Sequence, residues 1–207
     1  MSATAMDNVR SATPGQVRRS PSVPAHWPIR RHVAAAETTP AGPLHSVEVT
    51  VPAKTNLTLH VGPAHEEWGG RHALDTIYCA IGVNDVVTAT AKTPGSGFSL
   101  ELSGEHLGDL ASSGSDMRRN HAVHALFAIA RAAGREPDVA LHVDKHIPVG
   151  AGLGGGSADA AATLLAVNTL WGLHWPIERL RDIAATLGAD MPFCLEGGYA
   201  HGTGFGE

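Results

Sequence analysis

A glycine-rich segment in the second half of the chain has the composition of a phosphate-binding loop. Five glycines lie within the seven residues from Gly150 to Gly156, and an Ala- and Leu-rich helical pattern follows at once. Glycines let main-chain N–H groups approach an anion, and a helix N-terminus adds the positive end of its dipole. The residues predicted to bind phosphate groups here are Pro148, Gly150, Gly152, Leu153, Gly154, Gly155, Gly156 and Ser157.

Other interpretations of this segment fit less well. The Walker pattern requires Gly-Lys-Ser/Thr, and no lysine lies in the loop. The dinucleotide-binding pattern requires an acidic residue after a second strand, which is absent at the expected distance. A flexible linker rarely lies between a hydrophobic strand and a buried helix. Ser157 can bind a phosphate or metal ion, or simply cap the helix, whereas Asp159 is interpreted first as a structural residue of the first turn.

Three polar residues outside the loop have side chains suited to phosphoryl transfer. Lys54 is one of three lysines in the chain and lies in an alternating apolar pattern. A charged side chain in such a pattern suggests a specific role. A strand lysine that extends its ammonium group to solvent is the alternative. In a regular strand Asn56 faces the same side as Lys54, two residues earlier, and can orient Lys54 or a substrate. Asp190 follows a helix stop at Gly188 and can project into a cleft, although an ordinary surface aspartate also fits.

Hydrophobic periodicity predicts the elements that must position these residues. Strands are expected at 47–51, 57–61, 86–90, 98–102 and 139–143, the first two joined by the segment that contains Lys54. Helices are expected at 120–133, at 157–170 and from Pro176 to Leu187, with stops at Gly134 and Gly188. The second helix is apolar nearly all round, which predicts that it is buried. Hairpins early in the chain and helices later indicate an α+β fold.

Three segments resemble, in order and spacing, the signatures of the GHMP kinases, the small-molecule kinases related to galactokinase, homoserine kinase and mevalonate kinase. They are Pro52-Ala53-Lys54-Thr55-Asn56-Leu57, Gly152–Ala161 and Leu187–Phe193, and Gly202–Glu207 matches a further segment. The resemblance covers about residues 47 to 207. It implies an N-terminal domain with the two-layer α/β fold of a ribosomal protein domain, with only the start of a second, ferredoxin-like domain.

The resemblance also implies cofactors and roles. ATP and Mg²⁺ are expected at the glycine loop, with Ser157 as a candidate magnesium ligand. Asp190 is implied as the general base toward the acceptor hydroxyl group. Lys54 beside it would keep that carboxylate ionised and stabilise charge on the acceptor oxygen. Substrate contacts are expected from Asn56, Arg71 and His72.

The resemblance is strongest to family members that phosphorylate the 2-hydroxyl of a cytidine diphosphate-linked methylerythritol in non-mevalonate isoprenoid biosynthesis. In these members an Asp-Gly-Tyr-His segment holds the cytosine ring. Gly69 and Arg71 replace its Asp and Tyr here, and His72 is retained. An arginine plane can still stack on a base. Two alternatives stay open: a GHMP kinase for another small alcohol, and a truncated, catalytically silent relative that at most binds a nucleotide.

Composition excludes several other classes of protein. The net charge is −5, and residues 1–44 carry five Arg against Asp7 and Glu37, a net of +3, which leaves −8 for the remainder. An acidic body argues against nucleic-acid binding. No apolar run approaches the roughly 20 residues of a membrane helix. Two cysteines fit a reducing cytosol, so a cytoplasmic location is expected. The thirteen histidines are scattered, and no zinc site is predicted.

Residues 1–44 are expected to form a disordered arm, because they are rich in Ser, Thr, Pro, Ala and Arg without periodicity. Residues 45–207 are expected to form the ATP-binding domain, truncated before a C-terminal domain. A domain that lacks its usual partner exposes an apolar face. We therefore expect the chain to self-associate through that face.

Overall fold

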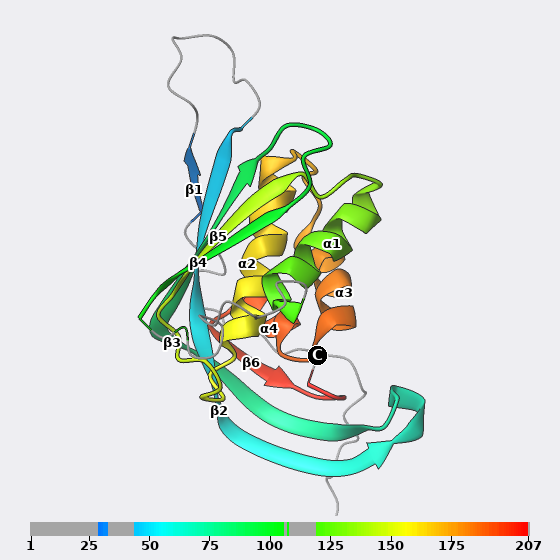
Figure 1. Ribbon diagram of the computed structural model, residues 1–207. Helices are drawn as coiled ribbons and strands as arrows, with labels where there is room; N and C mark the ends of the chain where they lie inside the picture. Colours follow the sequence, from blue (N-terminus) through cyan, green and yellow to red (C-terminus); the bar gives the residue numbers. More distant parts are fainter. Residues whose placement is uncertain (1–28, 33–43, 106, 108–118, 207) are drawn as a thin grey trace, which may run out of the picture.

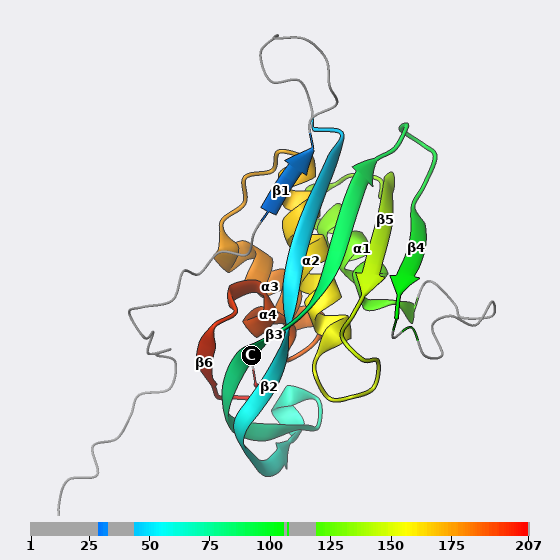
Figure 2. The same ribbon diagram turned by 90° about the vertical axis from the view of Figure 1, so that its left-hand side faces the viewer.

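The computed structural model describes residues 29–32, 44–105, 107 and 119–206. Within them, six strands form one mixed sheet in the order β1-β2-β3-β5-β4, with β6 paired to β3. The strands are β1 (Ile29–His32), β2 (Ser46–His65), β3 (Arg71–Ala91), β4 (Ser99–Gly104), β5 (Val139–Lys145) and β6 (Tyr199–Gly202). The helices are α1 (His121–Ala133), α2 (Gly155–Leu170), α3 (Ile177–Leu187) and α4 (Met191–Glu196), with a short 3₁₀ turn at Glu66–Trp68. Figures 1 and 2 show the helices gathered on one face of the sheet.

This arrangement is a two-layer α/β fold, as the sequence predicts; the start of a ferredoxin-like second domain stays a prediction. The expected disordered arm lies outside the described residues except at 29–32 and Leu44. The prediction is wrong for Ile29–His32, because these residues pair with β2 as strand β1.

The two strands expected at 47–51 and 57–61 are one continuous strand, β2, which pairs antiparallel with β3 along its length. Pro52 has no N–H group to donate to the sheet, and a proline is uncommon inside a paired strand. Here the register shifts between Pro52 and Ala53, so the irregularity bends β2 without ending it. Past Asn56 the β2–β3 ribbon curves round to the helix side of the sheet and passes below the helices in Figure 1, and its residues become exposed.

The strands predicted at 86–90 and 98–102 lie in β3 and β4, but they do not form a hairpin. Strand β5 inserts between them, pairing antiparallel with β3 and parallel with β4. The helix between β4 and β5 in the sequence is α1, which makes the crossover that a parallel pair requires.

The predicted helices are present, with ends set by local chemistry. Asn120 caps α1 by accepting a hydrogen bond from the Ala122 N–H at 2.8 Å, and Gly134 ends it in the left-handed region. Pro176 precedes α3, and Gly188 follows it. Helix α4 and strand β6 were not predicted from the sequence.

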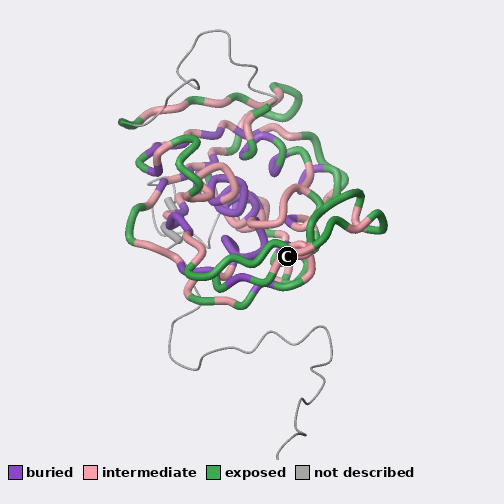
Figure 3. Tube along the Cα trace, turned by 90° about the horizontal axis from the view of Figure 1, so that it is seen from below, coloured by how far each residue is buried: buried purple, intermediate pink, exposed green. Residues whose placement is uncertain are grey.

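Helix α2 is the centre of the core. Ten of its sixteen residues are buried, and they lie on all sides of the helix. Many are alanines, whose small side chains let α1, α4 and the sheet pack closely around the helix axis. Figure 3 shows buried residues concentrated in the middle of the domain and exposed residues at its rim. The glycine loop is therefore attached to a helix that is buried at the centre of the core.

Candidate active site

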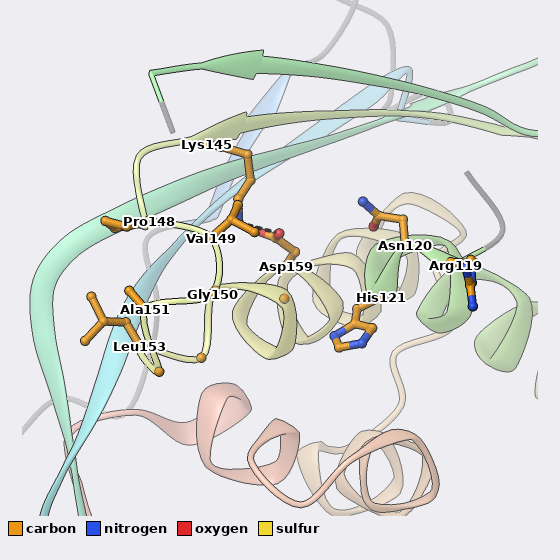
Figure 4. Close-up of a pocket in the computed structure, with 14 residues that line it drawn as sticks. Arg119, Asn120, His121, Lys145, Pro148, Val149, Gly150, Ala151, Leu153 and Asp159 are labelled. Carbon is orange, nitrogen blue, oxygen red and sulfur yellow. Dashed lines mark hydrogen bonds and ion pairs between the residues drawn. The ribbon is translucent and has the colours of Figure 1, made fainter. Parts of the chain in front are cut away.

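The glycine loop connects the end of β5 to the start of α2 and forms one wall of a cavity of about 250 Å³. Helix α1 contributes the opposite wall through its N-terminal residues (Figure 4). The lining residues are Arg119, Asn120, His121, Lys145, Pro148, Val149, Gly150, Ala151, Gly152, Leu153, Gly154, Gly155, Gly156 and Asp159. All the residues predicted to bind phosphate groups line this cavity, except Ser157.

The helix start differs from expectation. Gly154, in the left-handed region with φ of 70°, is the N-cap of α2, so Ser157 lies in the first turn and does not cap the helix. Because a Cβ at Gly156 would lie 2.6 Å from Nδ1 of His121, the first turn of α2 packs against the start of α1. Burial, followed by the neighbouring His124, lowers the pKa of His121. A neutral imidazole therefore faces the loop.

A buried ionic cluster of Lys145, Asp85 and Asp159 lies beneath the loop. The Lys145 ammonium group contacts Oδ2 of Asp85 and donates a hydrogen bond to Oδ2 of Asp159 at 2.7 Å. Oδ1 of Asp85 accepts the main-chain N–H groups of His146 and Ile147 at 2.6 and 2.8 Å. The cluster thus fastens both ends of the loop, at the end of β5 and in the first turns of α2.

The cluster carries two carboxylates against one ammonium group, and burial decides how they titrate. Burial alone would lower the pKa of Lys145, but Asp159 and Asp85 raise it, and the net shift is upward. Burial raises the pKa of Asp159 to about 7, although Lys145 opposes this shift. Oδ1 of Asp159 accepts no hydrogen bond from the described residues. That oxygen is the one available to carry a proton.

Lys54 links the far end of the glycine loop to Asp190. Its main-chain N–H donates to the carbonyl of Leu153 at 2.9 Å, and a Cβ at Gly154 would lie 2.7 Å from its Cγ. Glycine at 154 therefore makes room for the lysine side chain. The ammonium group reaches Oδ2 of Asp190 at 3.0 Å and donates to Oδ1 of Asn56 at 2.9 Å.

A short hydrogen-bond chain fixes the direction of Lys54. The Asn56 amide donates to the Thr76 hydroxyl at 2.6 Å, and that hydroxyl donates to the carbonyl of Thr58 at 2.6 Å. Asn56 therefore orients Lys54, one of the two roles that its position in the strand suggested. Thr76 is fully buried, so this support does not depend on solvent.

Tyr78, on β3, is a residue of this site that the sequence did not reveal. Its hydroxyl donates to Oδ1 of Asp190 at 3.0 Å, and its ring lies 5.5 Å from the Lys54 ammonium nitrogen. Asp190 lies just before α4, with 31% of its side chain exposed. The carboxylate is therefore held by two donors and is still accessible from solvent.

Arg71 and His72 lie at the outer end of the β2–β3 ribbon. The Arg71 guanidinium group stacks 4.4 Å from the ring centre of Phe205, and Nδ1 of His72 lies 2.9 Å from the carbonyl oxygen of Gly62. Both side chains are exposed. The structure brings Lys54, Asn56 and Asp190 into one cluster, whereas Arg71 and His72 are at a separate position along the ribbon.

The described residues contain no group of three or more His, Cys, Asp or Glu side chains arranged to hold a metal ion. Ser157 and Asp159, two positions apart on α2, point in different directions. Magnesium typically keeps few protein ligands and binds through substrate phosphates, which the glycine loop suits. A magnesium role for Ser157 stays a prediction.

Comparison with known proteins agrees with this geometry. Residues 120–198, from the start of α1 to just before β6, match the family described as GHMP kinases N terminal domain. The chain contains a GHMP kinase N-terminal domain. This GHMP kinase domain also resembles the crystal structure of a 4-(cytidine 5'-diphospho)-2C-methyl-D-erythritol kinase, with a TM-score of 0.60 and 36% identity over 77% of this chain and 53% of that one.

Curated relatives of the GHMP kinase domain carry the name 4-diphosphocytidyl-2-C-methyl-D-erythritol kinase. The protein from Bifidobacterium longum subsp. infantis is 80% identical over 162 residues, which are 78% of this chain and 51% of the relative. That from Bifidobacterium adolescentis is 77% identical over 164 residues, 79% of this chain and 53% of the relative. The chain thus spans about half the length of these relatives. None of its described helices is long and apolar enough to cross a membrane.

Proposed function

We propose that this chain carries the nucleotide-binding and proton-accepting half of a kinase. The reaction transfers the γ-phosphoryl group of ATP to the 2-hydroxyl of 4-diphosphocytidyl-2-C-methyl-D-erythritol, in the cytoplasm, for isoprenoid precursor synthesis. One observation carries the proposal: Lys54 contacts the glycine loop through its main chain and Asp190 through its ammonium group. The names of relatives at 77–80% identity support the choice of substrate.

In this proposal each element has one task in phosphoryl transfer, which needs positioning and charge stabilisation more than covalent chemistry. The N–H groups of the loop and the α2 N-terminus bind the triphosphate. Asp190 accepts the proton of the acceptor hydroxyl, whose oxygen bonds to the γ-phosphorus as the bond to the β–γ bridging oxygen breaks. Lys54 stabilises the charge that develops on the acceptor oxygen. Magnesium, when bound, would neutralise phosphate charge, with Ser157 as its candidate protein ligand.

A coupled assay of ADP release, with Mg-ATP and with or without the methylerythritol substrate, tests this function. We expect substrate-dependent ADP from the wild-type chain and a loss of about 10²-fold or more in Asp190→Asn, the range for removing a general base. Asp182→Asn is the matched control, because Asp182 is exposed on α3. A full-length relative assayed in parallel verifies the reagents. No ADP from this chain would favour the silent, nucleotide-binding alternative.

A kinase for another small alcohol is the second candidate. The residue at position 71, at the outer end of the β2–β3 ribbon, is the reason to test it. Arg71 stands where the resembling segment has the stacking tyrosine, and its guanidinium group already stacks on Phe205. A cytosine ring that stacks on Arg71 must therefore share the guanidinium group with Phe205 or displace Phe205 from it. Comparing kcat/KM across the cytidine-linked substrate, its truncated forms and other small alcohols decides between the two candidates. Arg71→Tyr should raise kcat/KM only for the cytidine-linked one.

We also propose self-association through an exposed apolar row on β2. Leu59 and Val61 lie two residues apart in a regularly paired part of the strand, so both face the same way, and Leu57 lies beside them at the register shift after Asn56. Each of the three residues is 56–58% exposed. Leu59→Lys should shift sedimentation toward the monomer, whereas His60→Lys, on the opposite face, should not. A wild-type chain that sediments as a monomer at all concentrations would contradict this.

A further inference from the structure

The Asp190 carboxylate has two unlike neighbours, one at each oxygen. Oδ2 lies 3.0 Å from the Lys54 ammonium nitrogen, and Oδ1 accepts the Tyr78 hydroxyl at 3.0 Å. A carboxylate held at both oxygens cannot rotate freely about its terminal torsion, which is otherwise broad. Tyr78 and Lys54 therefore fix the plane of the group together.

The Tyr78 ring is itself held from several sides. It stacks on Phe193 of α4, with ring centres 4.9 Å apart, and only 2% of the residue is exposed. A Cβ at Gly202 would lie 2.6 Å from the ring, and one at Gly206 would lie 2.8 Å from the hydroxyl oxygen. Both glycines permit close backbone approach, so the phenol has little room to move.

We propose that Tyr78 is a positioning residue for the transfer reaction. Its hydroxyl donates to Oδ1 of Asp190 and leaves Oδ2, beside Lys54, as the oxygen that accepts the substrate proton. This rests on the proposed function, because it assigns a supporting residue to the same base. A hydrogen bond from a fixed neutral donor orients a carboxylate without adding a second charge beside Lys54.

Tyr78→Phe tests this directly, because it removes only the hydroxyl. Tyr199→Phe is the matched control, since the chain has two tyrosines and Tyr199 is 60% exposed on β6. We expect kcat to fall about tenfold in Tyr78→Phe with the KM for ATP unchanged, the effect of one hydrogen bond to a charged group. The unchanged KM for ATP separates a loss of positioning from a general loss of structure.

A second readout needs no turnover. In a chain with ¹³C-labelled aspartate, the carboxyl signal of Asp190 is assigned by its loss in Asp190→Asn. That signal should move in Tyr78→Phe and stay in place in Tyr199→Phe. An unmoved signal overturns the proposal. If the wild-type chain releases no ADP, the proposed function fails, whereas the carboxyl signal still decides whether Tyr78 holds Asp190.

A conservative replacement guards against misfolding of the phenylalanine variant. In the Tyr199→Phe background, growth on 3-fluorotyrosine labels Tyr78 alone and keeps its hydroxyl donor. We expect this protein to retain the kcat and carboxyl signal of its background. Loss of both, with cooperative unfolding intact, would show that the hydroxyl donor is not what matters and would overturn the proposal.

Discussion

Two lysine–aspartate sites flank the start of α2, and they differ mainly in burial. Two consecutive glycines lie against the two lysines. A Cβ at Gly154 would lie 2.7 Å from Cγ of Lys54, and a Cβ at Gly155 would lie 3.2 Å from the Lys145 ammonium nitrogen. The Lys145 site is closed, with at most 5% of any of its three side chains exposed. At the Lys54 site, 31% of the Asp190 side chain is exposed.

This difference in burial indicates which charged groups affect stability and which affect the rate of the reaction. A buried ion pair recovers little of its desolvation cost, but removing one partner leaves a stranded charge. The Lys145 cluster should therefore act on stability and loop geometry. A partly exposed pair contributes little to stability, yet solvent access lets its carboxylate meet a substrate. The Lys54 site should therefore act on rate.

The largest expected effect is on stability at the closed site. Asp85→Ala should lower the free energy of unfolding by about 3–5 kcal/mol, because Lys145 loses a partner and two main-chain N–H groups lose their acceptor. Asp138→Ala is the control: Asp138 also accepts two main-chain N–H groups, from Gly95 and Gly97, but at a half-buried turn. We expect about 1 kcal/mol there. Equal losses in urea titrations would contradict the distinction.

At the open site the effects should be on rate. Asp190→Asn should change the free energy of unfolding by less than about 1 kcal/mol while lowering turnover about 10²-fold or more. Lys54→Ala should slow the same step, and the double variant should be little slower than either single one. A product of two independent losses in kcat would show that the residues do not share a task.

A smaller effect concerns pH at the closed site. With its pKa raised to about 7, Asp159 keeps a proton in the folded chain that an ordinary aspartate, near 3.8, has released. Between about pH 4 and 7 the folded state therefore binds more protons than the unfolded state, and this group lowers the free energy of unfolding as pH rises. Relative to wild type, Asp159→Asn should gain stability with rising pH in this window. Denaturant titrations that show a flat or falling difference would contradict this.

The parts of the site that the sequence revealed are those encoded locally. The glycine spacing predicted the loop, the α2 pattern predicted its burial, and the resemblance paired Lys54 with Asp190. Asp85 and Tyr78 were missed, because nothing beside them in sequence marks them. Tyr78 alternates in a strand like any core aromatic residue, and its contact with Asp190 depends on β3 register and the position of α4.

The bent course of β2 was missed for a similar reason. Pro52 reads as a break between two strands, because a proline cannot donate to a ladder. Pairing with β3 on both sides of the register shift keeps the strand continuous. Short α4 was missed because six residues carry too little periodicity, and Pro192 in its first turn resembles a loop. Contacts between residues far apart in the sequence determine both the continuity of β2 and the formation of α4.

The sequence separations of the two sites set an order of assembly. Lys145 joins Asp85 and Asp159 over 60 and 14 residues, whereas Tyr78 meets Asp190 over 112 residues. Longer closures lose more chain entropy, and a nascent chain emerges from its N-terminal end. When α2 has left the ribosome, every residue of the buried cluster has emerged, while Asp190, which follows α2 in the chain, has not. During translation the glycine loop can thus be ordered before Asp190 reaches Lys54.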